Sequence, residues 1–179
     1  DYNNCEIFTY VTVGQPTTIT ASITTTNVLC YGDSTGQMTA NSVSGGSGAP
    51  YTYAWSNGNT NPSNMDLWAG TYGLTITDGI GCFNTFPAII TQNSLIACPL
   101  GAQNISVAGA NDGIISVIST SGGTGGYSYS WSGPGGFTSS SLYLNWLSAG
   151  IYTLVVTDNS NCQQSFIQVI NEPNCNINI

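Results

Sequence analysis

The chain has 179 residues and carries eight acidic side chains but no Lys, Arg or His, which gives a formal net charge of −8. Nucleic-acid binding and attachment to anionic lipid both need cationic side chains, and no apolar run approaches the roughly 20 residues that span a bilayer. The composition therefore excludes nucleic-acid partners and membrane insertion, and the 4% of charged residues leaves solubility to polar side chains, a glycan coat or packing into an assembly.

Residues 1–16 are predicted to form a terminal strand that lies outside the two repeats of the chain. A spacing of ten residues between a Cys and a Gln or Glu occurs three times, at Cys5–Gln15, Cys82–Gln92 and Cys162–Glu172. Each span holds a β-rich run, so the first span is interpreted as the last strand of a preceding repeat or as a strand donated to a neighbour. Residues 174–179 resemble the start of a next repeat.

Residues 17–93 alternate β-branched and polar side chains between Gly, Pro and Asn turns. Strands are predicted within TITASITTTNVLC, QMTANSV, YTYAWS and TYGLTITD, which begin at Thr18, Gln37, Tyr51 and Thr71. Trp55 shares one face with Tyr51 and Tyr53 by the period of two and is an expected core residue. Because no segment has sustained helical periodicity, the fold is predicted to be all-β and an antiparallel sandwich.

Residues 94–173 repeat the same order of segments. The Gly-Gly pair recurs after 77 residues, from Gly45 to Gly122, and the Trp recurs after 76, from Trp55 to Trp131. Offsets that differ by a few residues indicate loops of variable length on a constant framework. The sequence therefore predicts two tandem immunoglobulin-like sandwich domains, 17–93 and 94–173.

The motifs of the first copy resemble those of the SprB repeat. They are C-x-G-x-x-x-G, SGG-x-x-x-P-Y-x-Y-x-W-S, L-x-A-G-T-Y-x-L-T-x-T-D-x-x-G-C and I-T-Q, and they extend from Cys30 to Gln92. SprB repeats occur in large surface and gliding adhesins of Bacteroidota and are similar in strand pattern to PKD and immunoglobulin-like modules. The second copy departs from the pattern, because Val107 stands at the position of Cys30 and Cys98 precedes PLGAQNIS, which is interpreted as an insertion.

Six cysteines without any histidine indicate disulfides rather than zinc, and hence an oxidising compartment. By analogy between the repeats, the simplest pairing is Cys30–Cys82 with Cys98–Cys162, which leaves Cys5 and Cys175 to pair between adjacent units. The sequence leaves a sequential pairing open as well, Cys5–Cys30, Cys82–Cys98 and Cys162–Cys175.

Three aromatic side chains, Trp68, Trp146 and Tyr143, are candidates for stacking on a sugar ring. Two short motifs are candidate glycosylation sites. Asn104 begins an Asn-Ile-Ser sequon, and Ser34 lies in Asp-Ser-Thr, which resembles the O-glycosylation motif of exported Bacteroidota proteins.

The acidic residues are spread singly along the chain, so neither a catalytic pair of carboxylates nor a metal site is expected. Asp33 and Asp112 are predicted to cap turns, and Asp78 and Asp158 to cap Thr-Asp corners. No cofactor and no enzymatic activity are expected.

The resemblance implies an extracellular or cell-surface protein. The favoured hypothesis is a structural subunit of a filament or long adhesin, assembled head to tail from disulfide-stapled repeats with neighbouring copies of itself as partners. The alternative is a carbohydrate-binding module that uses the exposed aromatic platforms.

Overall fold

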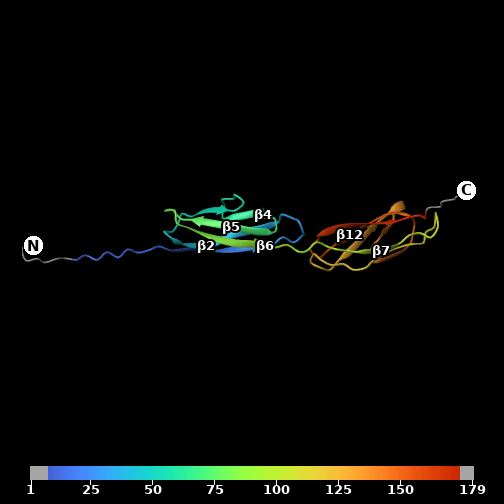
Figure 1. The fold of residues 1–179 in the computed structure, drawn as a ribbon, viewed down its shortest axis with the longest axis horizontal. Coiled ribbons are helices and arrows are strands. Elements are labelled where there is room, and N and C mark those ends of the chain that lie inside the picture. Colours follow the sequence, from blue (N-terminus) through green and yellow to red (C-terminus); the bar gives the residue numbers. More distant parts are fainter. Residues whose placement is uncertain (1–7, 174–179) are drawn as a thin grey trace, which may run out of the picture. The chain divides into compact units, whose positions relative to one another are not determined.

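The structure is a computed structural model in which residues 8–173 are described (Figure 1). The described chain contains strands and one short 3-10 helix: β1 (Thr17–Thr26), β2 (Gly36–Gly46), β3 (Thr52–Trp55), β4 (Ser63–Leu67), β5 (Gly70–Thr77), β6 (Phe83–Ile90), β7 (Leu100–Gln103), β8 (Gly113–Val117), β9 (Ser128–Ser132), η1 (Pro134–Gly136), β10 (Thr138–Ser139), β11 (Tyr143–Leu147), β12 (Gly150–Thr157) and β13 (Gln163–Ile170). Contacts divide it into two compact units. The first unit contains residues up to Thr26, Gln37–Met65 and Thr71–Ile89, and the second contains Asn27–Gly36, Asp66–Gly70 and the residues from Ile90 on.

The first sandwich consists of two antiparallel sheets, with strand orders β1-β2-β4 and β3-β5-β6. Trp55 of β3 pairs with Leu74 of β5, and their side chains are 3% and 0% exposed. Alternate residues of β5 are buried, as the period of two predicts. The placement of Trp55 in the core is confirmed.

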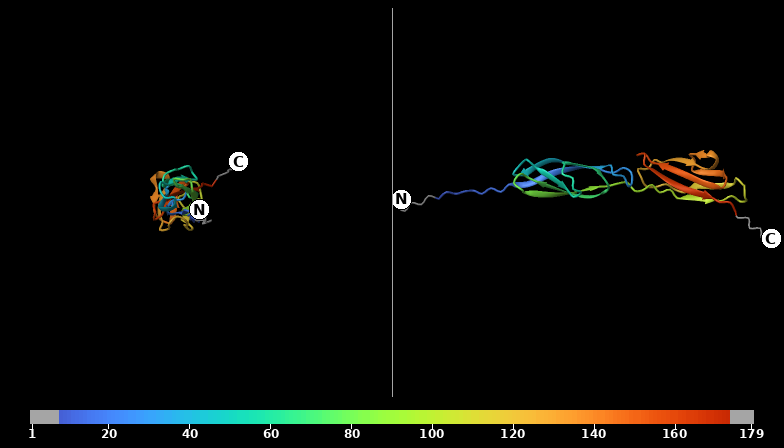
Figure 2. Two further views of the ribbon diagram at one scale, coloured as in Figure 1. Left: turned by 90° about the vertical axis from the view of Figure 1, so that its left-hand side faces the viewer. Right: turned by 90° about the horizontal axis from the view of Figure 1, so that it is seen from above.

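The second sandwich repeats this design with the orders β11-β8-β7 and β10-β9-β12-β13 (Figure 2). Its core contains Trp131 of β9, Leu154 of β12 and Ile115 of β8. Strand β12 pairs along its whole length with β13, from Gly150 opposite Ile170 to Thr157 opposite Gln163. The chain therefore has the predicted all-β, immunoglobulin-like class of fold, with two tandem sandwiches. The domain boundaries 17–93 and 94–173 remain predictions.

The segment PLGAQNIS is not an insertion, which corrects the interpretation from sequence. The offset between the repeats is 77 residues both at Ile19 and Ile96 and at Gly36 and Gly113. The segment contains β7, which pairs with β8 from Leu100 opposite Val117 onward, as β1 pairs with β2. The changed sequence, with Pro99 at the position of Ser22 and Gly101 at that of Thr24, shortens this edge strand.

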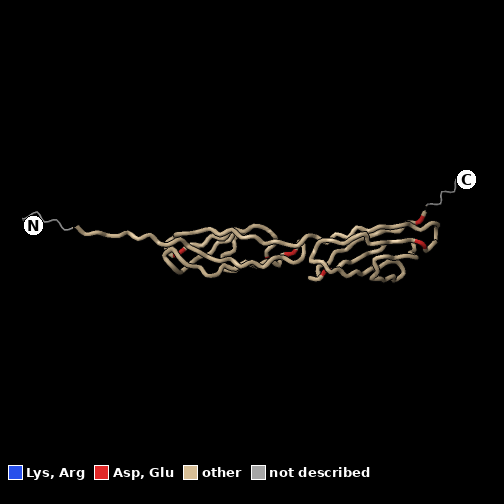
Figure 3. The backbone as a smooth tube through the Cα atoms, turned by 90° about the horizontal axis from the view of Figure 1, so that it is seen from below, with Lys and Arg blue, Asp and Glu red and all other residues tan. Residues whose placement is uncertain are grey.

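The charged residues are few along the described backbone (Figure 3). They are all acidic, since the chain has no Lys or Arg. Across residues 8–173, no helix has the length and apolar character that crossing a membrane requires.

Candidate functional site

A buried aspartate organises the corner before the last strand of each sandwich. Asp158 accepts hydrogen bonds from the backbone N–H groups of Thr124, Ser160 and Cys162, at 2.8, 2.8 and 3.0 Å. Asp78 accepts the equivalent bonds from Ser47, Ile80 and Cys82, at 2.8, 3.1 and 2.8 Å. Both carboxylates are thus turn caps, as their Thr-Asp motifs predict.

The hydrogen bonds lower the pKa of both carboxyl groups below the ordinary value of 3.8. For Asp78 the largest cause is the bond from the Ser47 backbone, which acts against desolvation by burial. For Asp158 burial is the largest single cause and would raise the pKa, but the N–H groups of Thr124, Cys162 and Ser160 together outweigh it. Both groups therefore stay ionised although no cationic side chain exists in the chain.

The Gly-Gly pair of each repeat is required by this corner. A Cβ atom on Gly123, whose φ is +57°, would lie 2.3 Å from Asp158 Oδ2, and one on Gly46, with φ of +62°, would lie 2.5 Å from Asp78 Oδ2. Glycine is the residue that adopts positive φ without a Cβ clash. The motif therefore serves the framework.

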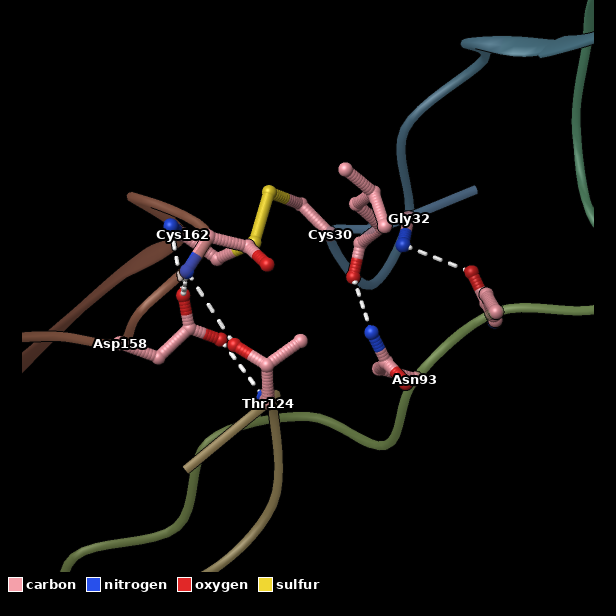
Figure 4. Close-up of a disulfide and its surroundings, with 9 residues drawn as sticks. Cys30, Gly32, Asn93, Thr124, Asp158 and Cys162 are labelled. Carbon is pink, nitrogen blue, oxygen red and sulfur yellow. Dashed lines mark hydrogen bonds between the residues drawn. A yellow bond between two sulfur atoms is a disulfide. The ribbon is translucent and has the colours of Figure 1, made fainter. Parts of the chain in front are cut away.

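A disulfide connects Cys162 of this corner to Cys30 (Figure 4), and both residues belong to the second unit. Their Cα atoms are 5.3 Å apart and 132 residues separate them in sequence. Leu29, Cys30 and Tyr31 cover the corner, which leaves a cavity of about 40 Å³ lined also by Ile96, Gly123 and Cys162. The disulfide thus joins the connection that follows β1 to the turn that precedes β13.

This disulfide corrects both pairings considered from sequence. Cys30 is bonded neither to Cys82 nor to Cys5, and the thiols of Cys82 and Cys98 are free. The physical reason is that Cys82 lies beside the first residues of β1, whereas Cys30 follows the last residue of that ten-residue strand. A strand of this length spans about 30 Å, well beyond the reach of a disulfide.

The corrected pairing also leaves Cys98 unpaired. Its side chain is buried, and its sulfur accepts a hydrogen bond from the Thr120 hydroxyl at 3.5 Å. Cys162 is already bonded to Cys30, so the pairs Cys98–Cys162 and Cys162–Cys175 do not form. Cys5 and Cys175 lie outside the described residues.

The connection after β1 is also held by hydrogen bonds to the segment that follows β6. Gln92 accepts a bond from the Gly32 N–H at 2.9 Å, Asn93 donates to the Leu29 carbonyl at 2.8 Å, and Asn27 accepts from the Thr91 N–H at 3.0 Å. These bonds fix the backbone on both sides of Cys30 (Figure 4).

The second repeat conserves two of these bonds at its own connection. Glu172 accepts a bond from the Gly109 N–H at 3.1 Å, and Asn104 accepts from the Asn171 N–H at 2.8 Å. Asn27 accepts the equivalent hydrogen bond although it is not part of a sequon. The side chain of Asn104 therefore has a structural role in the fold. Glycosylation of Asn104, and of the half-buried Ser34, remains a prediction.

Two of the three candidate sugar platforms lie together on the second unit. Tyr143 and Trp146 are 54% and 77% exposed and line an open pocket of about 270 Å³ with Asp112, Ile114 and Asn145. The Ser106 N–H donates to Asp112, and the Ser106 side chain and backbone bonds lower the pKa of that carboxyl. An exposed aromatic face beside a carboxylate and an amide is a combination that can bind a sugar ring and its hydroxyl groups.

Trp68 does not line this pocket, although its side chain is 58% exposed. Trp146 stands at the position of Asp66, and both residues have a positive φ, 57° and 56°. The strained backbone is therefore a shared bulge of the two repeats and not a mark of one site. The sequence predicted the aromatic residues but missed Asp112, which joins the pocket through the pairing of β8 with β11.

No group of three or more potential metal ligands occurs within residues 8–173. The geometry thus offers two sites with a distinct chemistry, the cysteine corner and the pocket of Tyr143 and Trp146.

Comparison with known protein families identifies the repeat. The SprB repeat model matches residues 22–60 and again residues 102–136, which include β2 and β8 with their flanking turns. A search of curated protein sequences finds no match.

Among the solved structures that resemble the chain are an ectodomain of three immunoglobulin domains and a fragment of intimin. The mouse nectin-like molecule 4 ectodomain has 10% identity and a TM-score of 0.41, over 89% of this chain and 66% of that one. A C-terminal fragment of intimin, solved with the intimin-binding domain of the translocated intimin receptor, has 13% identity and a TM-score of 0.40, over 86% and 64%. This chain spans less than two thirds of the length of either protein chain. The SprB repeat model thus matches one segment in each of the two sandwiches.

Proposed function

We propose that the chain is a structural module of a long cell-surface adhesin or extracellular filament, in which disulfide-stapled sandwich repeats follow one another head to tail. The SprB repeats support a surface adhesin-type module, and the disulfide supports an oxidising, extracytoplasmic setting. The near absence of charge suits a surface covered by neighbours or glycans.

The observation that carries the proposal is an exposed strand sequence at residues 8–13. Phe8, Tyr10, Val11 and Val13 are 72%, 92%, 81% and 91% exposed, and no strand is assigned to residues 8–16. Strand β6 precedes Gln92 at the same distance in sequence as this run precedes Gln15. Burial of such side chains contributes about 1.5–3 kcal/mol each, which favours pairing with another repeat.

Pairing of this segment needs only main-chain hydrogen bonds, so a sheet of a neighbouring repeat can accept it. The contact would not close on itself, because donor and acceptor are different surfaces, and such contacts generate filaments. The segment would then have the position that β6 and β13 have in the two sandwiches.

Immunogold labelling of native cells, with antibodies raised against the purified chain, tests this function. We expect gold on the outer surface and along extracellular fibres in electron micrographs. Label confined to the cell interior would contradict the proposal.

The homopolymer form of the proposal is tested on the purified chain by sedimentation. Association of copies through residues 8–13 would be lost in Val11→Pro, which has no N–H to donate, and kept in Val11→Thr. A monomeric unaltered chain would overturn the homopolymer form.

The pocket of Tyr143 and Trp146 favours a second candidate function, the binding of a glycan. We expect saturable binding on a glycan array that Trp146→Ala and Tyr143→Ala each abolish. Trp68→Ala is the matched control, because Trp68 does not line the pocket. Binding that survives both pocket substitutions would eliminate this candidate.

A further inference from the structure

We propose that the corner around Cys82 in the first unit is a socket for the cysteine-bearing connection of another SprB repeat, with which Cys82 forms a disulfide. The inference rests on the proposed function, since the partner is a further repeat of the same assembly. It is argued from the internal duplication, because the second unit shows the corresponding corner in its occupied form.

In the occupied corner, a short segment covers the turn that carries the cysteine. Leu29, Cys30 and Tyr31 pack there, and Cys30 is bonded to Cys162. With the segment in place, the cavity that remains is about 40 Å³. Leu29 and Tyr31 keep 57% and 53% of their surface exposed, so the segment lies on the corner as a cover.

The open corner of the first unit has a corresponding lining. A cavity of about 240 Å³ there is lined in part by Cys82. Six of its eight lining residues correspond to residues of the occupied corner: Thr17 to Ser94, Thr18 to Leu95, Ile19 to Ile96, Gly46 to Gly123, Cys82 to Cys162 and Phe83 to Gln163. The cavity of the first unit is formed without a covering segment. Its floor and its walls are already formed.

The backbone of Cys82 is held as that of Cys162 is held. The Cys82 N–H donates to Asp78 Oδ1 at 2.8 Å, and the Cys162 N–H donates to Asp158 Oδ1 at 3.0 Å. The Cys82 thiol is nevertheless free and exposed. An exposed thiol on a preformed turn, opposite an open cavity, is placed for cross-linking.

The proposed occupant is the connection after the first strand of a further repeat of the first type. The second repeat of another copy does not supply it, because Val107 occupies the position of Cys30. Apart from Cys82 itself, the described cysteines of such a copy are bonded, at Cys30 and Cys162, or buried, at Cys98.

Two features of the described N-terminal segment fit this occupant. Gln15 lines the open cavity and corresponds to Gln92, whose side chain holds the Gly32 N–H. Residues 8–13 have the position of the last strand of the repeat that would carry the connection, as β6 does for the connection at Cys30. One repeat would therefore use residues 8–13 as a strand, Gln15 as its anchor and Cys82 as its disulfide partner.

The cross-link is an oxidation of two thiols. One S–S bond forms while each S–H bond breaks, and two protons and two electrons pass to an oxidised dithiol carrier, whose own disulfide is reduced to two thiols. Such disulfide exchange is the usual route in extracytoplasmic compartments.

The test adds a repeat to the full chain. Residues 17–82 are fused directly ahead of Glu6, so that residues 6–15 serve as the last strand of the added repeat, and the Cys82 of the copy is replaced by Ser. The chain is refolded in a glutathione buffer and digested with pepsin, since it has no Lys or Arg for trypsin. We expect mass spectrometry to find the Cys30 of the added copy linked to the original Cys82, and that cysteine to lose its reactivity with iodoacetamide.

The matched control carries Val at the added Cys30, as the second repeat does at Val107. In this control Cys82 should be alkylated as fast as in the unextended chain, whereas buried Cys98 should react only after unfolding in every chain. Equal alkylation of Cys82 with and without the added cysteine would overturn the socket.

If the extended chain does not fold, a second experiment with a peptide tests the socket. A peptide with the sequence of residues 27–36 is incubated with the unextended protein, and a peptide with the same composition but with Cys and Gly exchanged serves as control. Preferential capture of the first peptide by Cys82 supports the socket, and equal capture overturns it. If Cys82 is a free thiol in fibres isolated from the cell surface, the socket alone is refuted. If Cys82 is disulfide-bonded in a chain that is absent from the cell surface, only the proposed function is refuted.

Discussion

The two aspartate corners have the same framework but differ in what covers them. Asp78 and Asp158 bind three N–H groups each, yet Cys82 is free and Cys162 is cross-linked. The difference comes from the covering segment, because six lining residues of one cavity correspond to six of the other. The comparison teaches that the corner folds without its cross-link and that the disulfide is an addition to it.

The largest expected effect tests whether the two sandwiches are equivalent at their cores. Trp131→Ala should destabilise the second sandwich by about 3–5 kcal/mol, and Trp55→Ala should do the same in the first, since a large buried ring is lost in each case. Both indole N–H groups donate to a backbone carbonyl, at 3.0 Å to Ser141 and 2.9 Å to Asn61. Urea unfolding followed by circular dichroism measures the change.

The exposed Trp146 provides the control for this pair. Because its ring is 77% exposed, Trp146→Ala should alter the free energy of unfolding by no more than about 0.5 kcal/mol. A loss at Trp55 much smaller than that at Trp131 would show that the cores are not equivalent.

Removal of the disulfide should destabilise the second unit, which contains both of its cysteines. The double variant Cys30→Ser with Cys162→Ser should lose about 2–4 kcal/mol, because the bond closes a long loop in the unfolded chain. Cys82→Ser should change the free energy of unfolding by less than about 0.5 kcal/mol, since it removes only an exposed thiol. Denaturant titrations with and without a reducing agent measure the free energy of unfolding of both variants. An equal loss in the two variants would contradict the conclusion that the Cys82 corner folds without a cross-link.

A methyl group at the Gly-Gly pair should act alike in both corners. Gly123→Ala and Gly46→Ala should each cost about 1–3 kcal/mol, because Cβ meets the carboxylate of the capping aspartate and φ is positive. Gly125, with φ of +77° and open space at its Cβ, is the control, for which Ala costs about 1 kcal/mol. Thermal melts rank the three variants, and a control as destabilised as Gly123→Ala would show that the clash has no effect.

Much of the fold followed from periodicity in the sequence. The alternation around Trp55 and in TYGLTITD predicted which side chains are buried, since a strand with one face in a core must follow a period of two. The aspartate caps followed equally, because a Thr-Asp motif before a turn has few other uses. The family resemblance added nothing to these local arguments but was confirmed by the match to two segments.

The disulfide could not be predicted, because the order of strands in the sheets decides which turns meet. The sequence shows Cys30 and Cys82 flanking one repeat, yet the length of β1 separates them. A signal was nonetheless present in the constant offset of 77 residues from Ile19 and Ile96 to Gly36 and Gly113. That offset assigns β7 to the position of β1 and removes the apparent insertion. The pocket at Trp146 was missed in part for the same reason, since Asp112 reaches it across a strand pairing.

The smallest expected effect is the dependence of stability on pH, and it should be similar in the two corners. The pKa of Asp158 is lowered in the folded state by three N–H groups, against an ordinary value of 3.8, so the charged form favours folding. This stabilisation is fully present above the unfolded pKa and is lost as the pH falls from about 4 through the lowered pKa. Asp158→Asn should therefore flatten the acid limb of a plot of unfolding free energy against pH for the second unit, and Asp78→Asn should do so for the first. Because the partners are N–H groups and not cations, added salt should leave the acid limb nearly unchanged, whereas a salt-sensitive limb would indicate long-range repulsion among the acidic side chains.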